Sequence, residues 1–335
     1  MKNLVTGASG LVGIHILIDL LSKGQNVYAT YTRKSNLSNV EKVFKFYNLI
    51  DLFSMVKWVE MNIEDTTEVF DCITNMDHVY HSAAIVSFLK KDQDKMKSVN
   101  VKGTANIVNA CLDKNVKKLG FISSVASIGR TKNKKGLYNE KTKWSISKAN
   151  SFYAITKYKA ENEVWRGVQE GLKAVITNPG VILGPSDWNR SSTTIFKKIY
   201  NGLAFSPTGS NGFVDVRDVS RSIIKLMESP IEAERYIVVG DNLSYKKIFN
   251  LIAKELNVKA PNKTASEIIL EIAWRLEAIR CFFTRKNPSL TKETAKTSNQ
   301  HNHYSNEKIK SALDFEFTRI DNAIKNTAKY ILKNQ

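Results

Sequence analysis

Short apolar runs alternate with stretches of helical periodicity over the first half of the chain. These runs predict β-strands, and in chain order they are Asn3–Thr6, Asn26–Thr30, Val56–Glu60, His78–His81, Leu119–Ser123 and Ala174–Thr177. The segment Leu11–Leu21, between the first two runs, has its apolar residues on one helical face wide enough to be buried against a sheet. This alternation predicts an α/β fold in which parallel strands are joined by right-handed helical crossovers.

The rhythm changes after about residue 178. Prolines and glycines interrupt the chain there, and two further strand-like runs, Phe213–Val216 and Tyr236–Val239, stand among helical stretches. Residues 285–305 are polar and are expected to be rich in loops. We therefore predict a second, smaller and mostly helical C-terminal lobe.

The segment Ala265–Phe283 has the pattern of an amphipathic helix, with large apolar residues on one side and three glutamates and two arginines elsewhere. Three interpretations stay open. The helix packs against the second lobe, roofs an apolar pocket, or lies on an anionic membrane with its arginines reaching past the apolar surface. Packing is the default, because the three glutamates weigh against a membrane-binding face.

Composition identifies a globular protein. Of the 335 residues 42% are hydrophobic, and 6 prolines and 16 glycines exclude collagenous and low-complexity chains. Three cysteines, Cys72, Cys111 and Cys281, lie far apart in no metal-ligand spacing, which indicates neither disulfides nor zinc and favours the cytoplasm. Glycines interrupt the apolar N-terminus, and no apolar run reaches the roughly 20 residues of a membrane span. We expect neither export nor a transmembrane segment.

The formal net charge is +18. Such a charge suits nucleic acid, an anionic membrane or a phosphorylated ligand. The lysine clusters are scattered, however, which is more typical of a solvated surface than of a groove for nucleic acid. We therefore expect no specific nucleic-acid partner, and at most weak contact with a membrane surface.

A glycine pattern follows the first strand directly. Residues Asn3–Gly13 read NLVTGASGLVG, with Gly7, Gly10 and Gly13 three residues apart at the opening of the first helix. Gly7 permits a tight turn, Gly10 lets backbone N–H groups approach a pyrophosphate, and Gly13 allows close packing of helix on strand. The alternative is an ordinary glycine-rich loop. The context favours a dinucleotide site in a Rossmann-type, doubly wound parallel sheet.

This site divides the chain. Residues 1–178 are expected to form the dinucleotide-binding domain, with residues 213–241 returning to it. Residues 179–212 and 242–335 are left for the substrate-binding lobe.

The end of the second strand indicates which dinucleotide binds. An acidic residue there would accept hydrogen bonds from the ribose 2′-hydroxyl of NAD, whereas basic residues accommodate the 2′-phosphate of NADP. Thr30–Lys34 reads Thr-Tyr-Thr-Arg-Lys, so Arg33 or Lys34 could pair a phosphate and no carboxylate is present. The sequence predicts NADP(H), with NAD left open. The alternative is two solvated cations.

Three polar side chains are the candidate chemistry. Tyr153 and Lys157 stand four residues apart in a segment of helical periodicity, so they share one helix face. An ammonium beside a phenol stabilises the phenolate, which predicts a lowered pKa for Tyr153 and proton exchange near neutral pH. Ser124 follows the strand Leu119–Ser123, where a hydroxyl can donate to a substrate carbonyl. The alternatives are a solvent-exposed pair and a hydroxyl that caps backbone.

Several segments together resemble the extended short-chain dehydrogenase/reductase superfamily, also called the NAD-dependent epimerase/dehydratase superfamily. They are Thr6–Gly13, His81–Ala84, Asn100–Thr104, Ser123–Ser124 with Gly129, Tyr153–Lys157, Asn178–Gly180 and Phe213–Asp218. The likeness covers about residues 1–240. It implies that Tyr153 is the general acid/base, that Lys157 tunes it and bonds the nicotinamide ribose, and that Ser124 orients the carbonyl.

The resemblance also assigns supporting residues. Asn100 matches a helix asparagine that supports a water-linked proton path to the lysine; the alternative is a buried Asn that bonds backbone across a helix bend. His81 is expected to be structural. The residues expected to bind the cofactor are Gly7, Ser9, Gly10, Leu11, Val12, Gly13, Arg33, Lys34, Asn62, Ile63, His81, Ala83, Ala84, Lys157, Pro179, Gly180 and Val181.

The chain lacks residues that are typical of two branches of the superfamily, and this absence indicates a third branch. Dehydratases carry an acidic pair where this chain has Val125 and Ala126, and epimerases usually carry an arginine where Asn211 stands. The chain is more similar to the dihydroflavonol 4-reductase and 3β-hydroxysteroid dehydrogenase-like branch, whose members reduce or oxidise a carbonyl or alcohol on a bulky, often apolar substrate. It departs from that branch at three positions, Thr32, Asn62 and Asn178.

Two segments are expected to form walls of the substrate pocket. The stretch between Ser127 and Asn150 is longer than a connection between strand and helix requires, and such loops commonly cover ligands. Val181–Trp188 is the second wall. The alternative for both is plain surface loop.

The leading hypothesis is an NADP-dependent oxidoreductase that acts on a small-molecule carbonyl or alcohol. A nucleotide-sugar epimerase with the same residues is the first alternative, and a non-enzymatic dinucleotide sensor is the second. A homodimer is left open.

Overall fold

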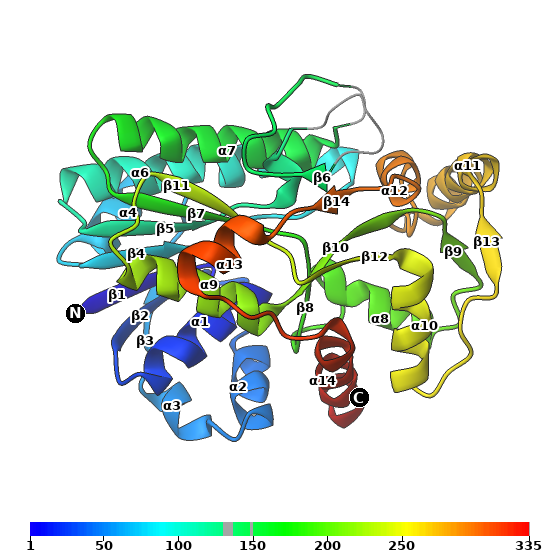
Figure 1. Cartoon of the computed structure of the whole chain (residues 1–335), viewed down its shortest axis with the longest axis horizontal. Helices are drawn as coiled ribbons and strands as arrows, with labels where there is room; N and C mark the ends of the chain where they lie inside the picture. The colour runs from blue at the N-terminus through cyan, green and yellow to red at the C-terminus, as the bar shows by residue number, and fades with distance from the viewer. Residues whose placement is uncertain (130–136, 148–149, 335) are drawn as a thin grey trace.

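A seven-stranded, fully parallel sheet runs through the molecule (Figure 1). The computed structural model describes residues 1–129, 137–147 and 150–334. The sheet order is β11-β7-β5-β4-β1-β2-β3, so the chain changes direction between β1 and β4. The strands are β1 (Lys2–Thr6), β2 (Asn26–Tyr31), β3 (Lys57–Glu60), β4 (His78–His81), β5 (Lys118–Ile122), β7 (Ala174–Pro179) and β11 (Glu234–Val238).

The predicted Rossmann-type sheet is therefore confirmed. The six apolar runs of the first half are all strands of this sheet, and their bounds differ from the expected ones by at most two residues. A change of direction in an open α/β sheet creates a crevice at the carboxyl ends of the strands, where ligands bind. The candidate residues Gly7, His81 and Ser124 follow or end three neighbouring strands, β1, β4 and β5, at that edge.

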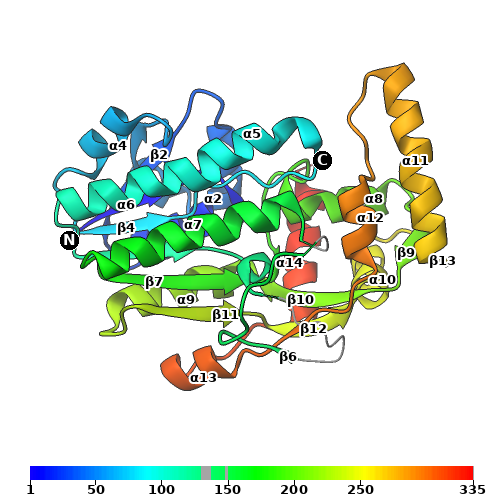
Figure 2. The same ribbon diagram turned by 90° about the horizontal axis from the view of Figure 1, so that it is seen from above.

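Helices cover both faces of the sheet (Figures 1 and 2). One face carries α1 (Leu11–Ser22), α2 (Leu37–Phe46), α3 (Ile50–Ser54) and α9 (Val216–Glu228). The other carries α4 (Thr66–Ile73), α6 (Gly103–Asp113) and α7 (Phe152–Gln169). Each layer buries its own apolar cluster, with Leu17 and Ile223 in the first and Ile107 and Val164 in the second. Burial of this apolar surface is the main force that holds the helices to the sheet.

The approach to α6 contains a wide turn. A 3₁₀ turn (Lys90–Asp92) and α5 (Gln93–Met96) lead into a π-helical stretch at Lys97–Lys102, which continues as α6. Such π turns insert a residue into the helix and are frequent at functional sites. Asn100 lies in this one and is buried.

The second lobe mixes helices with small sheets. Strands β8 (Val181–Leu183), β10 (Ser210–Asp215) and β12 (Asp241–Ser244) form one sheet; β9 (Phe205–Pro207) pairs with β13 (Lys263–Ala265), and β6 (Leu137–Tyr138) pairs with β14 (His303–Tyr304). Its helices are α8 (Thr194–Tyr200), α10 (Tyr245–Glu255), α11 (Glu267–Thr284), α12 (Lys292–Ser298), α13 (Glu307–Leu313) and α14 (Ile320–Lys333), and 3₁₀ turns occur at Val125–Ser127 and Ser191–Thr193.

Two sequence expectations need correction here. Within residues 213–241, α9 and β11 do return to the main sheet, but the run that begins at Phe213 belongs to β10 and pairs with β8 and β12. Residues 285–305 are not only loop, because they contain α12 and β14. A capping box formed by Thr291 and Thr294 starts α12, so a polar segment acquires a helix from its cap rather than from apolar periodicity.

The last helix joins the two parts. On α14, Tyr330 donates a hydrogen bond to Asn39 Oδ1 at 3.1 Å, and Asn326 donates to the hydroxyl of Tyr47 at 3.1 Å. Ile324 is fully buried in the same apolar cluster as α1 and α9. One continuous core therefore extends from the main sheet to the end of the described chain.

The prediction that Ala265–Phe283 packs against the second lobe is correct for one side of the helix, which contacts α12, but not for its large apolar residues, which are exposed. The helix is present as α11, but none of its residues is buried. It projects from the lobe at one end of the molecule, beside α12 (Figure 2). No helix of the described residues, α11 included, has the length and apolarity to cross a bilayer.

Candidate active site

The glycine turn between β1 and α1 is packed too closely for side chains. Gly7 has a φ of 66°, and a Cβ there would lie 2.6 Å from the Cα of Ala83. A Cβ on Gly13 would lie 2.3 Å from the carbonyl oxygen of Gly7. Only glycine fits these positions, and their absence of side chains brings the ends of β1 and β4 into contact.

The start of α1 fits the diphosphate of a dinucleotide. Gly10 is the N-cap and has no side chain to occupy the N–H groups of the first turn. The Gly10 carbonyl accepts the first helical hydrogen bond from Ile14 at 3.0 Å, so the N–H groups of Leu11, Val12 and Gly13 precede the helical ladder. With Ser9 half-buried before them, these groups and the helix dipole favour an anion.

His81 ends β4 directly beside this turn. Its ring is fully buried, with Nδ1 2.7 Å from Thr6 Oγ1 and Nε2 3.0 Å from Thr104 Oγ1. Burial, with a smaller contribution from nearby Lys157, lowers the pKa of His81 to about 3. The imidazole is therefore neutral and held on both sides, the arrangement expected of a structural histidine. Ala83 and Ala84 continue from it along the crevice, where Ala84 is exposed.

Ser124 and Tyr153 lie together at the carboxyl end of β5. Ser124 caps the 3₁₀ turn that follows the strand, its Oγ accepting from the N–H of Ala126 at 3.1 Å. The Tyr153 phenol, near the start of α7, is close enough to the Ser124 side chain for the serine to affect the pKa of the phenol, and it lies edge-on to Phe88, with 6.3 Å between ring centroids. Ser151 caps α7 by accepting from Ala154, which fixes the first turn that holds Tyr153.

Lys157 lies one helical turn below Tyr153 and is 2% exposed. Its Nζ donates to the carbonyl oxygen of Ile122 at 2.8 Å and stands 4.5 Å from the ring centroid of Phe121. Burial lowers the pKa of Lys157 from 10.5 to about 7, and the Glu161 carboxylate opposes that shift. The lysine is therefore held beneath the crevice in a form that loses its proton readily.

The predicted pKa of Tyr153 is wrong in direction for the unliganded chain. Removal of the phenol from water raises its pKa to about 12, and only the nearby Ser124 side chain acts against this. Lys157 does not lower it, because its ammonium is bonded to Ile122 and is itself destabilised by burial. Desolvation disfavours both charged forms at once.

We expect burial of Lys157 to make stability depend on pH. Its pKa is about 7 in the folded chain and 10.5 when unperturbed, so between these values the unfolded chain binds more protons at this site. The free energy of unfolding therefore rises with pH across that window, by at most about 1.4 kcal/mol per pH unit. Chemical denaturation from about pH 7 to about pH 9 should show this rise in wild type relative to Lys157→Met. A stability difference independent of pH would contradict the assignment.

Asn100, in the π turn, forms hydrogen bonds with the segment after β4 and with α7. Its Oδ1 accepts from the N–H of Ile85 at 2.8 Å, and its Nδ2 donates to the carbonyl of Ile85 at 2.9 Å and to Thr156 Oγ1 at 3.1 Å. Asn100 thus bonds backbone at a helix bend, as in the structural alternative, and ties the segment after β4 to α7 directly beside Lys157.

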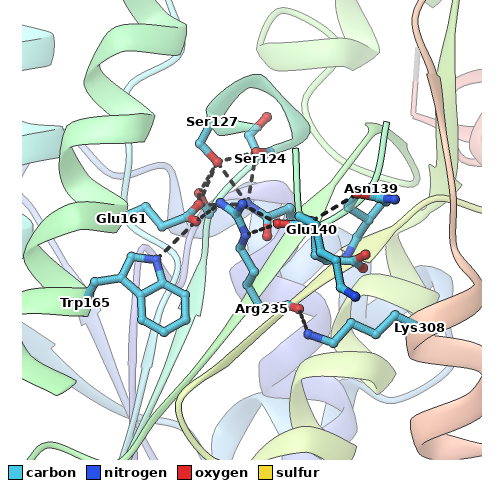
Figure 3. A network of polar contacts seen from close by, with 12 residues as sticks. Ser124, Ser127, Asn139, Glu140, Glu161, Trp165, Arg235 and Lys308 are labelled. Atoms are coloured by element: carbon cyan, nitrogen blue, oxygen red, sulfur yellow. Dashed lines mark hydrogen bonds and ion pairs between the residues drawn. The ribbon is translucent and has the colours of Figure 1, made fainter. Parts of the chain in front are cut away.

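The sequence analysis missed a buried carboxylate, Glu161, one turn beyond Lys157 on α7 (Figure 3). It is 2% exposed. One oxygen, Oε2, accepts from Ser123 and Ser127 at 2.6 Å each and from Asn178 at 2.8 Å. The carboxylate therefore joins α7 to the segments on both sides of Ser124 and to the end of β7.

The other oxygen of Glu161 pairs with a half-buried arginine. Arg235 on β11 donates to Oε1 at 2.9 Å, and Trp165 donates to the same oxygen at 3.4 Å. Arg235 also bonds the carbonyl of Glu140, whose own carboxylate accepts from the N–H of Ile237 at 2.8 Å (Figure 3). This Glu161–Arg235 network fixes the 137–147 segment against the far edge of the sheet.

The basic residues after β2 stand at the opposite end of the crevice. Arg33 and Lys34 are exposed, and Arg33 Nε pairs with Glu60 at the end of β3, 2.8 Å away. Asn62 is exposed, whereas Ile63 is buried against Gly103. The Arg33 guanidinium could pair with a 2′-phosphate, but in this structure it is already paired with the Glu60 carboxylate, so the phosphate would have to displace Glu60.

The expected pocket walls are partly described. Residues 130–136 and 148–149 of the Ser127–Asn150 loop lie outside the described residues. Within the described part, Trp144 stacks on Tyr158 of α7, with 4.3 Å between ring centroids. The second expected wall, Val181–Trp188, follows Gly180, which donates to the carbonyl of Val238 at 3.1 Å. A Cβ on Gly180 would lie 2.4 Å from the carbonyl oxygen of Gly212, so the two sheets meet closely at this point.

A doubly wound sheet, a glycine turn at its switch point, and a serine, tyrosine and lysine at the end of β5 together define an NAD(P)-dependent enzyme of the extended short-chain dehydrogenase/reductase type. The family model of the NAD dependent epimerase/dehydratase family matches residues 3–240. The chain therefore belongs to this family, as its motifs predicted.

Named relatives agree with the enzyme class. The chain is 27% identical to sterol demethylase protein B of Methylococcus capsulatus over 294 residues, covering 86% of this chain and 85% of that protein. It is 28% identical to dihydroflavonol 4-reductase of Arabidopsis thaliana over 247 residues, 70% of this chain and 64% of that protein. The solved structure of gox2253 has a TM-score of 0.81 at 23% identity and covers 99% of this chain and 98% of its own. That last likeness supports the fold alone.

Proposed function

We propose that this protein is an NADP(H)-dependent oxidoreductase that interconverts a carbonyl and an alcohol on a bulky, largely apolar substrate. The observation that carries the proposal is that the Tyr153 phenol and Ser124 lie close enough to interact at the carboxyl end of β5, with Lys157 buried one turn below. The similarity to dihydroflavonol 4-reductase supports a reductase rather than another chemistry. Within the proposal, residues 1–178 with α9 and β11 hold the dinucleotide, and the second lobe holds the substrate.

NADPH bound at the glycine turn and the start of α1 would supply a hydride to the carbonyl carbon. As that carbon gains two electrons, the Tyr153 hydroxyl gives its proton to the carbonyl oxygen, and the product is a neutral alcohol. Ser124 donates to the same oxygen and fixes its position, because its Oγ is oriented by the hydrogen bond from Ala126. The raised pKa of Tyr153 keeps the phenol protonated at neutral pH, which suits a proton donor in the direction of reduction.

Lys157 is proposed to return the proton to Tyr153. With its pKa near 7, its Nζ holds or releases a proton at neutral pH at little cost. The hydrogen bond to Ile122 holds Nζ in place while the charge changes. Asn100 is proposed as a positioning residue, since it bonds the residue before Lys157 on α7.

Two neighbouring chemistries are less well supported by the residues. Elimination of water needs the acidic pair that Val125 and Ala126 replace. Epimerisation of a nucleotide sugar needs a cation for the diphosphate, but Asn211 stands at that place and donates to the hydroxyl of Tyr245 at 3.2 Å. A site that has Ser124, Tyr153 and Lys157 but neither the acidic pair nor the cation for a diphosphate is suited to transfer of a hydride and a proton alone.

A substrate panel tests the proposal. Bulky ketones and aldehydes are incubated with the protein and NADPH while the absorbance of reduced nicotinamide is followed; sustained oxidation is expected with at least one of them. Interconversion of nucleotide sugars without net oxidation would establish the epimerase instead. Salt-sensitive DNA binding with no turnover would favour the non-enzymatic sensor.

We expect the cofactor preference to depend on Arg33. Its guanidinium is proposed to leave Glu60 and pair with the 2′-phosphate of NADPH, a charge-assisted contact. Arg33→Ala should therefore raise the Kd for NADPH about 10-fold, the scale of one such hydrogen bond, and leave the Kd for NADH unchanged. Calorimetric titration with both cofactors measures this. Glu60→Gln is the matched control and should not weaken NADPH binding. Equal affinity of the wild type for NADH and NADPH would contradict the preference.

A further inference from the structure

The two long sides of α11 differ in what they contact. The side that faces α12 carries Leu270, Ala273, Trp274 and Cys281, all of them partly covered. The opposite side carries the larger apolar residues, and these are exposed: Ile268, Ile269, Ile272, Leu276, Ile279 and Phe283. The more apolar face of the helix is therefore left uncovered by the described chain.

These six residues, the α11 stripe, form one continuous surface. At 100° per residue they fall within an arc of about 100° on the helix. Leu276 is 61% exposed and Phe283 is 78% exposed, and the neighbouring Phe282 is 81% exposed. A large apolar patch of this kind on the outside of a folded chain marks an interaction surface.

Arginines border the α11 stripe on both sides. The same helical geometry places Arg275 at one edge and Arg280 at the other. Each is held by a glutamate of the helix, Arg275 by Glu271 at 3.0 Å and Arg280 by Glu277 at 2.7 Å. The glutamates lie outside the stripe, so they neutralise charge within the helix without placing carboxylates on the apolar face. Arginines at the edges of an apolar face can bury their stems and keep their charge at the level of lipid headgroups.

Further positive charge stands at the end of the helix. Arg285 and Lys286 follow α11 directly and are exposed. The loop they begin returns to the body of the protein, where Lys91 donates to Asn287 Oδ1 at 2.6 Å and Lys198 donates to the carbonyl of Ser289 at 2.9 Å. Cations therefore surround the C-terminal end of the stripe, and the whole chain carries +18.

We propose that α11 lies flat on an anionic lipid bilayer, with the α11 stripe in contact with the acyl chains and its arginines at the headgroups. The apolar arc, its arginine borders and the positive chain together form the pattern of an interfacial amphipathic helix. A second copy of this chain is the less suitable occupant, because two chains of +18 each repel one another. The three glutamates of the helix do not oppose this contact, because all of them lie off the stripe and Glu271 and Glu277 are paired with arginines.

Sedimentation with lipid vesicles tests the proposal on the full chain. Wild type is expected to sediment with phosphatidylcholine vesicles that contain phosphatidylglycerol, and to be released by salt. The double variant Ile272→Asp, Ile279→Asp places two carboxylates in the stripe and should lower the partition coefficient at least about 10-fold. Leu332→Asp on α14 is the matched control, because it changes an exposed apolar residue elsewhere and should sediment as wild type does.

Four other outcomes would each contradict the proposal. Equal sedimentation of wild type and the double variant would exclude the stripe, and equal binding to pure phosphatidylcholine would exclude the anionic headgroups. A concentration-dependent dimer that the double variant abolishes would make the stripe a contact between copies. A change in KM without any vesicle binding would make α11 the roof of the substrate pocket. Thermal unfolding of all variants shows that each one is folded, and vesicle binding and oligomeric state are measured without the proposed oxidoreductase activity.

Discussion

Replacing Tyr153 by phenylalanine is expected to lower kcat at least about 100-fold, the scale of a lost general acid. The substitution removes one oxygen and keeps the ring that lies beside Phe88. Ser124 keeps its backbone partner Ala126 and stays in place to orient a carbonyl. The Kd for NADPH is therefore expected to stay unchanged, because the glycine turn and α1 are untouched. Steady-state kinetics and cofactor titration measure the two quantities separately.

The matched control for that variant is Tyr158→Phe on the same helix. Tyr158 stacks on Trp144, and a phenylalanine ring can make the same contact. Its turnover should stay within about two-fold of wild type, as for a residue outside the site. Near wild-type turnover of the Tyr153 variant would end the assignment of this phenol as the proton donor. Equal losses in both variants would point to a structural effect on α7 instead.

Glu161→Gln is expected to cost about 3 kcal/mol of folding free energy, the low end of the range for breaking a buried ion pair. The change removes the buried negative charge that pairs with Arg235. It also places an amide N–H₂, itself a donor, beside groups such as Ser123 and Asn178 that donate to the carboxylate in wild type. Lys157 also loses the nearest group that favours its charged form, so its pKa should fall further. Denaturant titration gives the stability, and the pH profile of kcat shows whether the titrating group has moved to lower pH.

Glu163→Gln is the control for the carboxylate. Glu163 stands two residues away on α7 and pairs with Arg166 at 2.9 Å on the surface. Exposed pairs of this kind contribute at most about 1 kcal/mol, so this variant should be close to wild type in stability. A Glu161 variant that is no less stable than the Glu163 variant would show that the network does not hold the site together. Lost stability with an unmoved pH profile would leave Glu161 a structural residue only.

The fold was predictable because its signals are local. A buried parallel strand is a short apolar run, and Gly7, Gly10 and Gly13 mark the turn after the first one by the same short-range reasoning. Sequence separation hides which strands become neighbours, which is why the run at Phe213 was assigned to the wrong sheet. The polar α12 was missed for a related reason, since its start depends on the cap formed by Thr291 and Thr294 and not on apolar spacing.

The candidate site was predictable as far as its residues stand in short motifs. Ser124, Tyr153 and Lys157 could be placed from strand end and helix spacing alone. Glu161 could not, because its partner Arg235 lies 74 residues away and becomes a partner only when β11 joins the sheet. One signal was present: Glu161 stands four residues after Lys157, which puts both on one face of α7. The pKa of Tyr153 was predicted in the wrong direction, because spacing says nothing about how far either group is removed from water.

The α11 helix shows a further limit of periodicity. An apolar stripe predicts that something covers it, but the pattern is the same whether the cover is the protein itself or another phase. Packing was the reasonable default, and only the exposed fractions of residues such as Leu276 reverse it.

The position of α14 has a consequence for how the protein is made. The final helix buries Ile324 and Tyr330 in the core that also contains α1, and it bonds Asn39 near the beginning of the chain. A nascent chain on the ribosome cannot complete this core until residues 320–333 have left the exit tunnel. The growing polypeptide must therefore wait with the part of the core beneath α14 uncovered, and a stop codon before residue 320 should leave a product that chaperones retain and proteases remove.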